Sequence, residues 1–191
     1  MITQALLFLT QTIGNLFIIA VLLRFLMQMF RVPFKNSFAQ FIVAVTNFAV
    51  RPLRRVIPGV FGQDWASLLV ALIVEFLVVL IGYWLIDFPI ALAGSQVWSV
   101  FLGLSVVRLL SLMLYLLIGL TVVGAVLSWI NPYSALMPVV SQLTEPFLRP
   151  IRRVVPLIAN VDLSPLVLIV ILQLLLIVPI HATERALIGM L

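Results

Sequence analysis

The sequence predicts an all-α membrane protein with four transmembrane helices, arranged as two parallel-oriented hairpin repeats. Hydrophobic residues make up 64% of the 191-residue chain and charged residues only 9%, too few to cover a soluble domain of this size. Several apolar runs exceed the roughly 20 residues that cross a hydrocarbon core. The block Arg51–Pro58 (RPLRRVIP) also recurs, at an offset of 98 residues, as Arg149–Pro156 (RPIRRVVP).

Four runs are long and apolar enough to span a membrane: about residues 5–30, 65–86, 105–130 and 163–180. The third run belongs to a longer apolar stretch, 97–130, which either tilts or begins with an interfacial turn that ends near Arg108. A short polar tail, His181 to Arg185, follows the fourth run. No Lys or Arg precedes Arg24, so the first run is expected to be a retained span rather than a signal peptide.

The repeated block indicates a tandem duplication, and the same offset pairs several polar residues: Thr46 with Thr144, Asp64 with Asp162, and Glu75 with Gln173. We therefore expect two repeats, residues 1–95 and 96–191, with two spans each. Because each repeat crosses the membrane twice, both insert with the same polarity, and their pseudo-symmetry axis lies along the membrane normal.

The distribution of Lys and Arg predicts the orientation. The loops after the first and third spans are basic, carrying Arg31, Lys35, Arg51, Arg54, Arg55, Arg149, Arg152 and Arg153. The middle loop, about residues 87–96, carries no Lys or Arg. The positive-inside rule places both basic loops in the cytoplasm, with the middle loop and both termini outside.

The basic loops also predict amphipathic segments. Residues 37–50 are apolar but too short to span, so they are either interfacial or re-entrant. In a helical turn the three arginines of each block share one face, because their spacing is i, i+3, i+4: Arg51, Arg54 and Arg55, then Arg149, Arg152 and Arg153. Aliphatic residues supply the opposite face, which is typical of a helix in the headgroup region. Pro52 and Pro150 are expected to interrupt or kink these helices.

These six arginines are candidates for binding anionic lipid or a protein partner. DNA fits less well, because six arginines without interleaved exposed aromatic residues or a nucleic-acid-binding fold are a weak footprint. Asp64 and Asp162 precede the second and fourth spans, where a carboxylate complements the positive end of a helix. We expect both to cap those helices, and each can also pair with an Arg of its own loop.

Glu75 is the sharpest intramembrane candidate, because an ionised carboxylate near the bilayer midplane is costly unless it is paired or hydrated. Two interpretations stay open: a cation or proton site, or a hydrogen-bonded contact with Gln173 that holds the spans together. Arg24 is expected to snorkel from the first span to the headgroups, with pairing to Glu75 as the alternative.

Enzyme motifs are missing from the sequence. It has no Cys and a single His, and it lacks a nucleophile triad, a glycine-rich phosphate loop and a zinc motif. We therefore expect no catalytic residues, no metal and no cofactor.

The repeated block resembles the YggT family. The Arg-Pro-aliphatic-Arg-Arg block, the Asp soon after it and the preceding element 127–132 (LSWINP) carry the resemblance. The first copy has a degenerate leading element at Met27–Met29, without the Ser-Trp pair, and an insertion of about two residues. The resemblance implies a small bacterial inner-membrane protein without a catalytic residue set. Roles associated with the family are osmotic tolerance and potassium handling, nucleoid or division-site organisation, and assembly of a plastid cytochrome.

The expected function is that of a non-enzymatic organising or assembly protein of the inner membrane. Its Arg-rich faces would bind anionic headgroups and dock a membrane protein partner or a second copy of the chain. Nucleic acid is not an expected partner. The alternative is a channel-like protein or a modulator of potassium flux in osmotic adaptation, with Glu75 and Gln173 near the pathway. Four spans are thin for a pore, so this alternative requires an oligomer.

Overall fold

The computed structural model describes residues 1–34, 36–57, 63–90, 92–155 and 162–191. Its elements are α1 (Ile2–Met29), α2 (Ser37–Val56), α3 (Trp65–Leu85), α4 (Gln96–Ile130), α5 (Met137–Arg152), α6 (Ser164–Leu175), the π-helical turn η1 (Leu176–Ile180) and α7 (His181–Ile188). No β-strand occurs in these ranges, so the predicted all-α class is confirmed for them. Lys35, Pro58 and Pro156 lie outside the described residues.

Four helical segments are long and apolar enough to cross a membrane: Ile2–Met29, Trp65–Leu85, Gln96–Ile130 and Ser164–Ile188. Large apolar side chains such as Leu16 and Trp84 point outward from them, which hydrocarbon accommodates and water would not. The prediction of a multi-pass membrane protein is therefore confirmed.

Of the two alternatives for the third span, the interfacial turn was wrong: helix α4 is continuous over 35 residues from Gln96, so no turn separates its first part from Arg108. The tilted span stays a prediction. The fourth span does not end at Ile180, because the expected polar tail continues it as α7. Pro179 lies in η1, where a widened π-helical turn joins α6 to α7 in one run. A proline cannot supply the usual N–H of an α-helix, which gives a physical reason for the irregular turn at this point.

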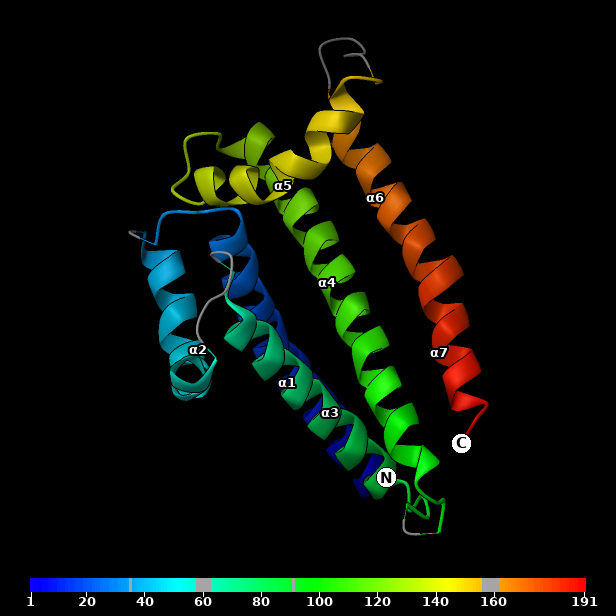
Figure 1. Cartoon of the computed structure of the whole chain (residues 1–191). Helices are drawn as coiled ribbons and strands as arrows, with labels where there is room; N and C mark the ends of the chain where they lie inside the picture. Colours follow the sequence, from blue (N-terminus) through cyan, green and yellow to red (C-terminus); the bar gives the residue numbers. More distant parts are fainter. Residues whose placement is uncertain (35, 58–62, 91, 156–161) are drawn as a thin grey trace.

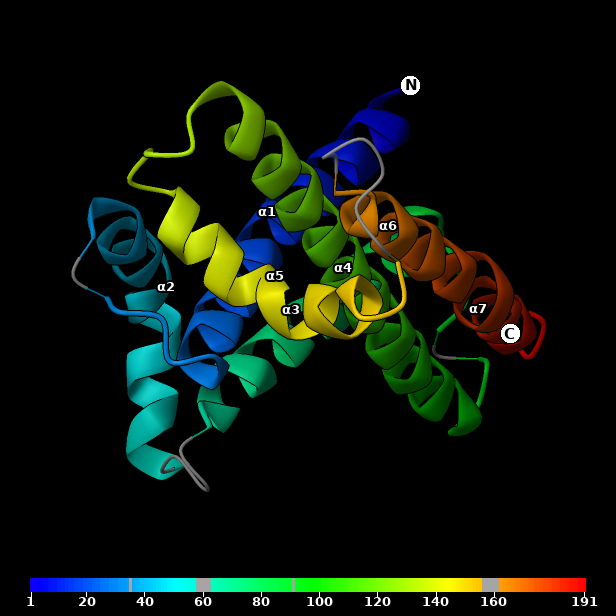
Figure 2. The ribbon, with the colours of Figure 1, turned by 90° about the horizontal axis from the view of Figure 1, so that it is seen from above.

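We call the end of the bundle near the arginine blocks of α2 and α5 the basic end (Figure 1). Both termini and the connection between α3 and α4 lie at one end; α5 lies across the other end, and α2 lies beside the half of α1 that is nearer α5. Helix α1 packs mainly on α3, and α4 stands between this pair and α6. Seen from above, α5 crosses the end of the bundle, where it contacts α1, α4 and α6 (Figure 2).

Helices α2 and α5 contain the arginines of the two blocks, except Arg153, which directly follows α5. Residues 37–56, which include the first six residues of the first block, form one continuous helix, α2. Its start is capped by a hydrogen bond from the Ala39 N–H to the Asn36 side chain at 2.6 Å. Pro52 lies inside α2 and Pro150 inside α5, so neither proline interrupts its helix, and a kink at either proline stays a prediction. A proline removes only its own donor, and near a helix end the remaining hydrogen bonds carry the chain past it.

Candidate functional site

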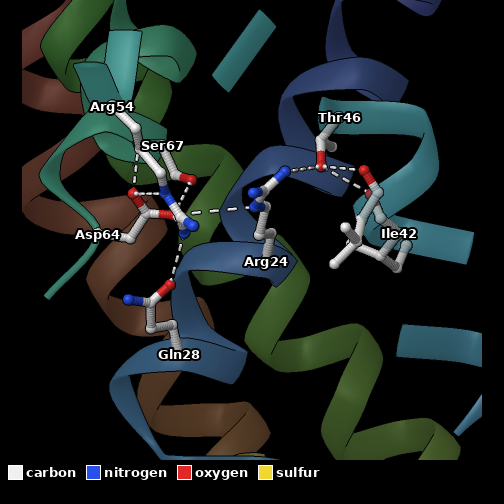
Figure 3. Close-up of polar contacts among 8 residues, drawn as sticks. Arg24, Gln28, Ile42, Thr46, Arg54, Asp64 and Ser67 are labelled. Carbon is white, nitrogen blue, oxygen red and sulfur yellow. Dashed lines mark hydrogen bonds and ion pairs between the residues drawn. The ribbon is translucent and has the colours of Figure 1, made fainter. Parts of the chain in front are cut away.

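A polar cluster that we call the first polar site lies where α1, α2 and α3 meet (Figure 3). Its members are Arg24, Gln28, Thr46, Arg54, Asp64 and Ser67. Asp64 is the residue immediately before α3 and is only 2% exposed. Its carboxylate accepts hydrogen bonds from the Ser67 hydroxyl at 2.5 Å and from the Ser67 N–H at 3.4 Å, and so holds the first turn of α3.

Arg54 connects α2 to both neighbouring helices. Its Nε donates to Asp64 Oδ1 at 3.1 Å, and its Nη2 donates to Asp64 Oδ2. The same Nη2 donates to Gln28 Oε1 of α1 at 2.8 Å. A two-pronged contact of guanidinium and carboxylate is both stronger and more directional than a single hydrogen bond. The rotation of α2 about its own axis is therefore fixed against α1 and α3.

Arg24 enters the first polar site from α1 and lies between Asp64 and Thr46 (Figure 3). It is 4% exposed; its Nη1 donates to Thr46 Oγ1 at 2.9 Å, and its Nε lies 3.8 Å from Asp64 Oδ2. The Thr46 hydroxyl in turn donates to the Ile42 carbonyl at 2.7 Å. The expectation that Arg24 snorkels was wrong, and so was its alternative pairing with Glu75. Partners inside the fold offset the cost of burying the guanidinium.

Opposing effects act on Asp64. Burial acts to raise its pKa, but the hydrogen bonds from Arg54 and Ser67 outweigh burial and leave the pKa below its ordinary value. The hydrogen bond to Asp64 raises the pKa of Arg54. Both groups are therefore charged at neutral pH, and the first polar site holds two guanidinium groups around one carboxylate.

The second polar site lies between α5 and the start of α6, and consists of Thr144, Glu145, Arg152, Asp162 and Ser164. Arg152 donates from Nε to Asp162 Oδ2 at 2.8 Å and from Nη1 to Glu145 Oε2 at 2.7 Å. Asp162 Oδ1 accepts the Ser164 N–H at 2.9 Å. Burial acts to raise the pKa of Asp162, but the hydrogen bonds from Ser164 and Arg152 leave it below its ordinary value. Asp162 is 31% exposed, far more than Asp64.

Each arginine block is therefore divided between two roles. The middle arginine, Arg54 or Arg152, pairs with an Asp ten residues later. The other four, which we call the outward arginines, are exposed and form no salt bridge among the described residues: Arg51, Arg55, Arg149 and Arg153. Sequence reasoning treated the three arginines of a block alike. The equal spacing of ten residues in both copies was the signal that could have separated them.

Glu75 lies in a third polar environment, in the middle of α3. It is 2% exposed, and its Oε2 has no hydrogen-bond partner among the described residues. It lines a small cavity of about 240 Å³ together with Gln11, Asn15, Val78, Arg108, Ser111, Leu112, Tyr115, His181 and Glu184. Arg108 Nε lies 3.1 Å from Glu184 Oε1 across this cavity.

Gln173 does not take part in the cavity around Glu75. Its side chain is exposed on α6, so one of the two open interpretations of Glu75, a hydrogen-bonded contact with Gln173, was wrong. Helix α4 instead contributes Arg108, Ser111 and Tyr115 to the cavity, and α7 contributes His181 and Glu184. Within the described ranges, no group of three or more His, Cys, Asp or Glu side chains is placed to hold a metal ion.

Comparison with known proteins identifies the family. The profile of the CCB3/YggT family matches residues 3–85 and 103–182. The chain belongs to the CCB3/YggT family. The first polar site falls within the first matched segment and the second polar site within the second.

Several bacterial relatives share most of this length. The chain is 36% identical over 171 residues to the uncharacterized protein YggT of Escherichia coli K12, covering 88% of this chain and 85% of the relative. It is 33% identical over 181 residues to an uncharacterized protein of Pseudomonas aeruginosa, with coverage of 91% and 87%. It is 39% identical over 171 residues to an uncharacterized protein in the proC 3′ region of Vibrio alginolyticus, with coverage of 87% and 88%. No solved structure matches.

Proposed function

We propose that this family member is a non-enzymatic organising or assembly protein of the bacterial inner membrane. Its outward arginines bind anionic headgroups and a membrane protein partner. One observation carries the proposal: α2 lies beside, and α5 across, the half of the bundle away from the termini, and each arginine block has two exposed arginines beside an Arg–Asp pair that ties its helix to the following span.

The exposed face of α2 suits a position at the membrane surface. Phe41, Val45 and Phe48 are exposed at 62%, 37% and 73%, and their spacing places them on one stripe of the helix. Asn47, Phe48, Arg51, Pro52 and Arg55 line one shallow pocket, so an apolar side chain lies beside two cationic ones. An apolar stripe bordered by arginines is the arrangement with which helices lie in the headgroup layer. Each arginine there contributes about 1 kcal/mol of attraction to an anionic surface.

The proposal includes the orientation in the membrane. The basic end faces the cytoplasm and both termini face outward, with residues 1–95 and 96–191 inserted as two parallel hairpins. The two matched family segments and the repeated arginine block support this arrangement. The positive-inside rule supports the sidedness, because only Arg108 and Arg185 belong to helix segments toward the end that carries the termini.

The lipid part of the proposal is tested with spin-labelled lipids and protein in nanodiscs. We expect the wild-type protein to enrich phosphatidylglycerol over phosphatidylcholine in its immobilised lipid shell. The variant with Arg51, Arg55, Arg149 and Arg153 all changed to Glu should lose this enrichment. Arg185→Glu, at the opposite end, is the matched control and should keep it. An unchanged enrichment in the fourfold variant would overturn the lipid-binding role of these arginines.

A second candidate function, ion movement with Glu75 near the pathway, is favoured by one observation. A buried carboxylate oxygen, with no hydrogen-bond partner in the part of the chain that the structure describes, faces a polar cavity among the spans. Potassium flux into liposomes that contain the purified protein tests it, with wild type beside Glu75→Gln. Flux that rises with protein dose and falls in the variant would support transport. Flux equal to that of protein-free liposomes would exclude it.

A further inference from the structure

A groove of about 620 Å³ opens between α4, α5 and α6 at the basic end. This volume lies within the range of ligand sites, about 300–1,000 Å³. Its walls are mainly apolar, with Val122, Val126, Leu166, Ile169 and Val170 among them. Its polar end is formed by Thr144, Glu145, Arg152 and Asp162 of the second polar site. One end of the groove is therefore polar and charged, and the rest is mainly apolar.

Two residues of α1 occupy the space in the first polar site that corresponds to this groove. Aligning the degenerate element Met27–Met29 with 127–129, at an offset of 100, pairs Gln28 with Ser128 and Arg24 with Gly124. Arg24 and Gln28 reach across to Thr46 and Arg54 and fill the space between the three helices. Gly124 and Ser128 are too short to fill the corresponding space, and both line the groove.

The position of Gly124 confirms that the two sites correspond in space. A Cβ at Gly124 would lie 3.1 Å from Val140 Cγ1. Val140 accepts the hydrogen bond of Thr144, as Ile42 accepts that of Thr46 beside Arg24. Gly124 therefore faces the same turn of α5 that Arg24 faces on α2.

The charges of the two sites are opposite. The first polar site surrounds one carboxylate with two guanidinium groups, Arg24 and Arg54. The second surrounds one guanidinium group, Arg152, with two carboxylates, Glu145 and Asp162. The polar end of the groove thus carries one net negative charge. It complements a ligand that brings a cation and also an anion for Arg152.

The open side of the groove faces the hydrocarbon. Val126 is 45% exposed and Leu166 61%, and both belong to membrane-spanning helices. Trp129, 80% exposed at the rim, belongs to the end of α4, where indole rings settle at headgroup level. A ligand that enters from the bilayer would therefore bring an apolar chain first and keep its polar group at the level of Arg152.

We propose that this groove binds a phospholipid with a primary ammonium headgroup. Its acyl chain lies along the valine and leucine walls, its ammonium group lies beside Glu145 and Asp162, and its phosphate lies beside Arg152. The proposal is separate from anionic-lipid binding by the outward arginines, because none of these arginines lines the groove.

The test is native mass spectrometry of the purified full-length protein with phosphatidylethanolamine or phosphatidylglycerol of equal chain length. We expect the wild type to retain phosphatidylethanolamine about tenfold better, the size of one charge-assisted hydrogen bond. Val126→Trp fills the groove and should abolish this retention. Val123→Trp is the matched control, because Val123 has nearly the same exposure, 44%, but does not line the groove. Glu145→Gln with Asp162→Asn should remove the headgroup preference without removing lipid retention.

Three results would overturn the proposal. Equal retention of the two lipids by the wild type would show that the acidic groups do not select the headgroup. Equal retention of phosphatidylethanolamine in Val126→Trp and Val123→Trp would place the lipid elsewhere. A wild-type dimer that Val126→Trp dissociates would assign the groove to a second copy of the chain. The fourfold Glu variant of the outward arginines should keep its groove lipid, so the two proposals fail independently.

Discussion

The first and second polar sites are built from the same repeated block but differ in how far they are closed. Both contain an Arg and an Asp ten residues apart, and the Asp precedes a membrane span in each. Asp64 is 2% exposed and lies between Arg54 of α2 and Arg24 of α1, whereas Asp162 is 31% exposed beside an open groove. A repeated ion pair can therefore fix helices together in one copy and remain accessible to ligands in the other.

The largest expected effect is the unequal cost of removing the two aspartates. Asp64→Ala leaves Arg24 buried without its carboxylate, and breaking a buried pair in this way costs about 3–5 kcal/mol. Asp162→Ala breaks a partly exposed pair, worth about 0–1 kcal/mol, and also a bond to the start of α6, worth about 1 kcal/mol. Thermal unfolding in detergent compares the two variants. Equal losses of stability would contradict the difference between the sites.

Lowering the pH should also reduce the stability contribution of the first polar site more than that of the second. The pKa of each Asp is lower in the folded protein than its ordinary value. The stabilisation is therefore complete above the ordinary aspartate pKa of about 3.9 and is lost as the pH falls through the lower folded-state pKa. Unfolding temperatures across this acidic range should fall less steeply in Asp64→Asn than in the wild type. Asp162→Asn should change the slope less, and a larger change there would reverse our ranking.

Hydropathy and charge counting were enough to predict the all-α class and the four spans, because these features depend on local composition. The burial of Arg24 and its choice of partners depend on tertiary contacts instead. Its partners lie 22 residues away at Thr46 and 40 residues away at Asp64, and hydropathy contains no information on either contact. The repeat also misled the prediction for Gln173, because equivalent positions in sequence face different surroundings once α6 stands apart from the α1–α3 pair.

The two threonines give a matched test of intermediate size. Thr46→Val removes the acceptor of the Arg24 hydrogen bond, and a hydrogen bond to a charged group is worth about 1.5–3 kcal/mol. Thr144→Val removes only a bond from the hydroxyl to a backbone carbonyl, worth about 0.5–1.5 kcal/mol. Unfolding temperatures in detergent should therefore fall further for Thr46→Val. A larger fall for Thr144→Val would show that the second polar site contributes more to stability than its contacts indicate.

The smallest expected effect concerns the glycine that stands where α1 has Arg24. Gly124→Ala gains about 1 kcal/mol of helix propensity. However, its new Cβ would approach Val140 Cγ1 to 3.1 Å, so α5 must give by a few tenths of an ångström. Gly119→Ala is the control on the same helix, because a Cβ there meets nothing within 4 Å and the gain in propensity is unopposed. Gly119→Ala should raise the unfolding temperature in detergent by more than Gly124→Ala. If both variants gain equally, α5 is free to move at this contact, and the small residue at position 124 is not needed for α4 and α5 to pack. The groove would then depend on the absence of a long side chain at position 124 rather than on the close approach of the two helices.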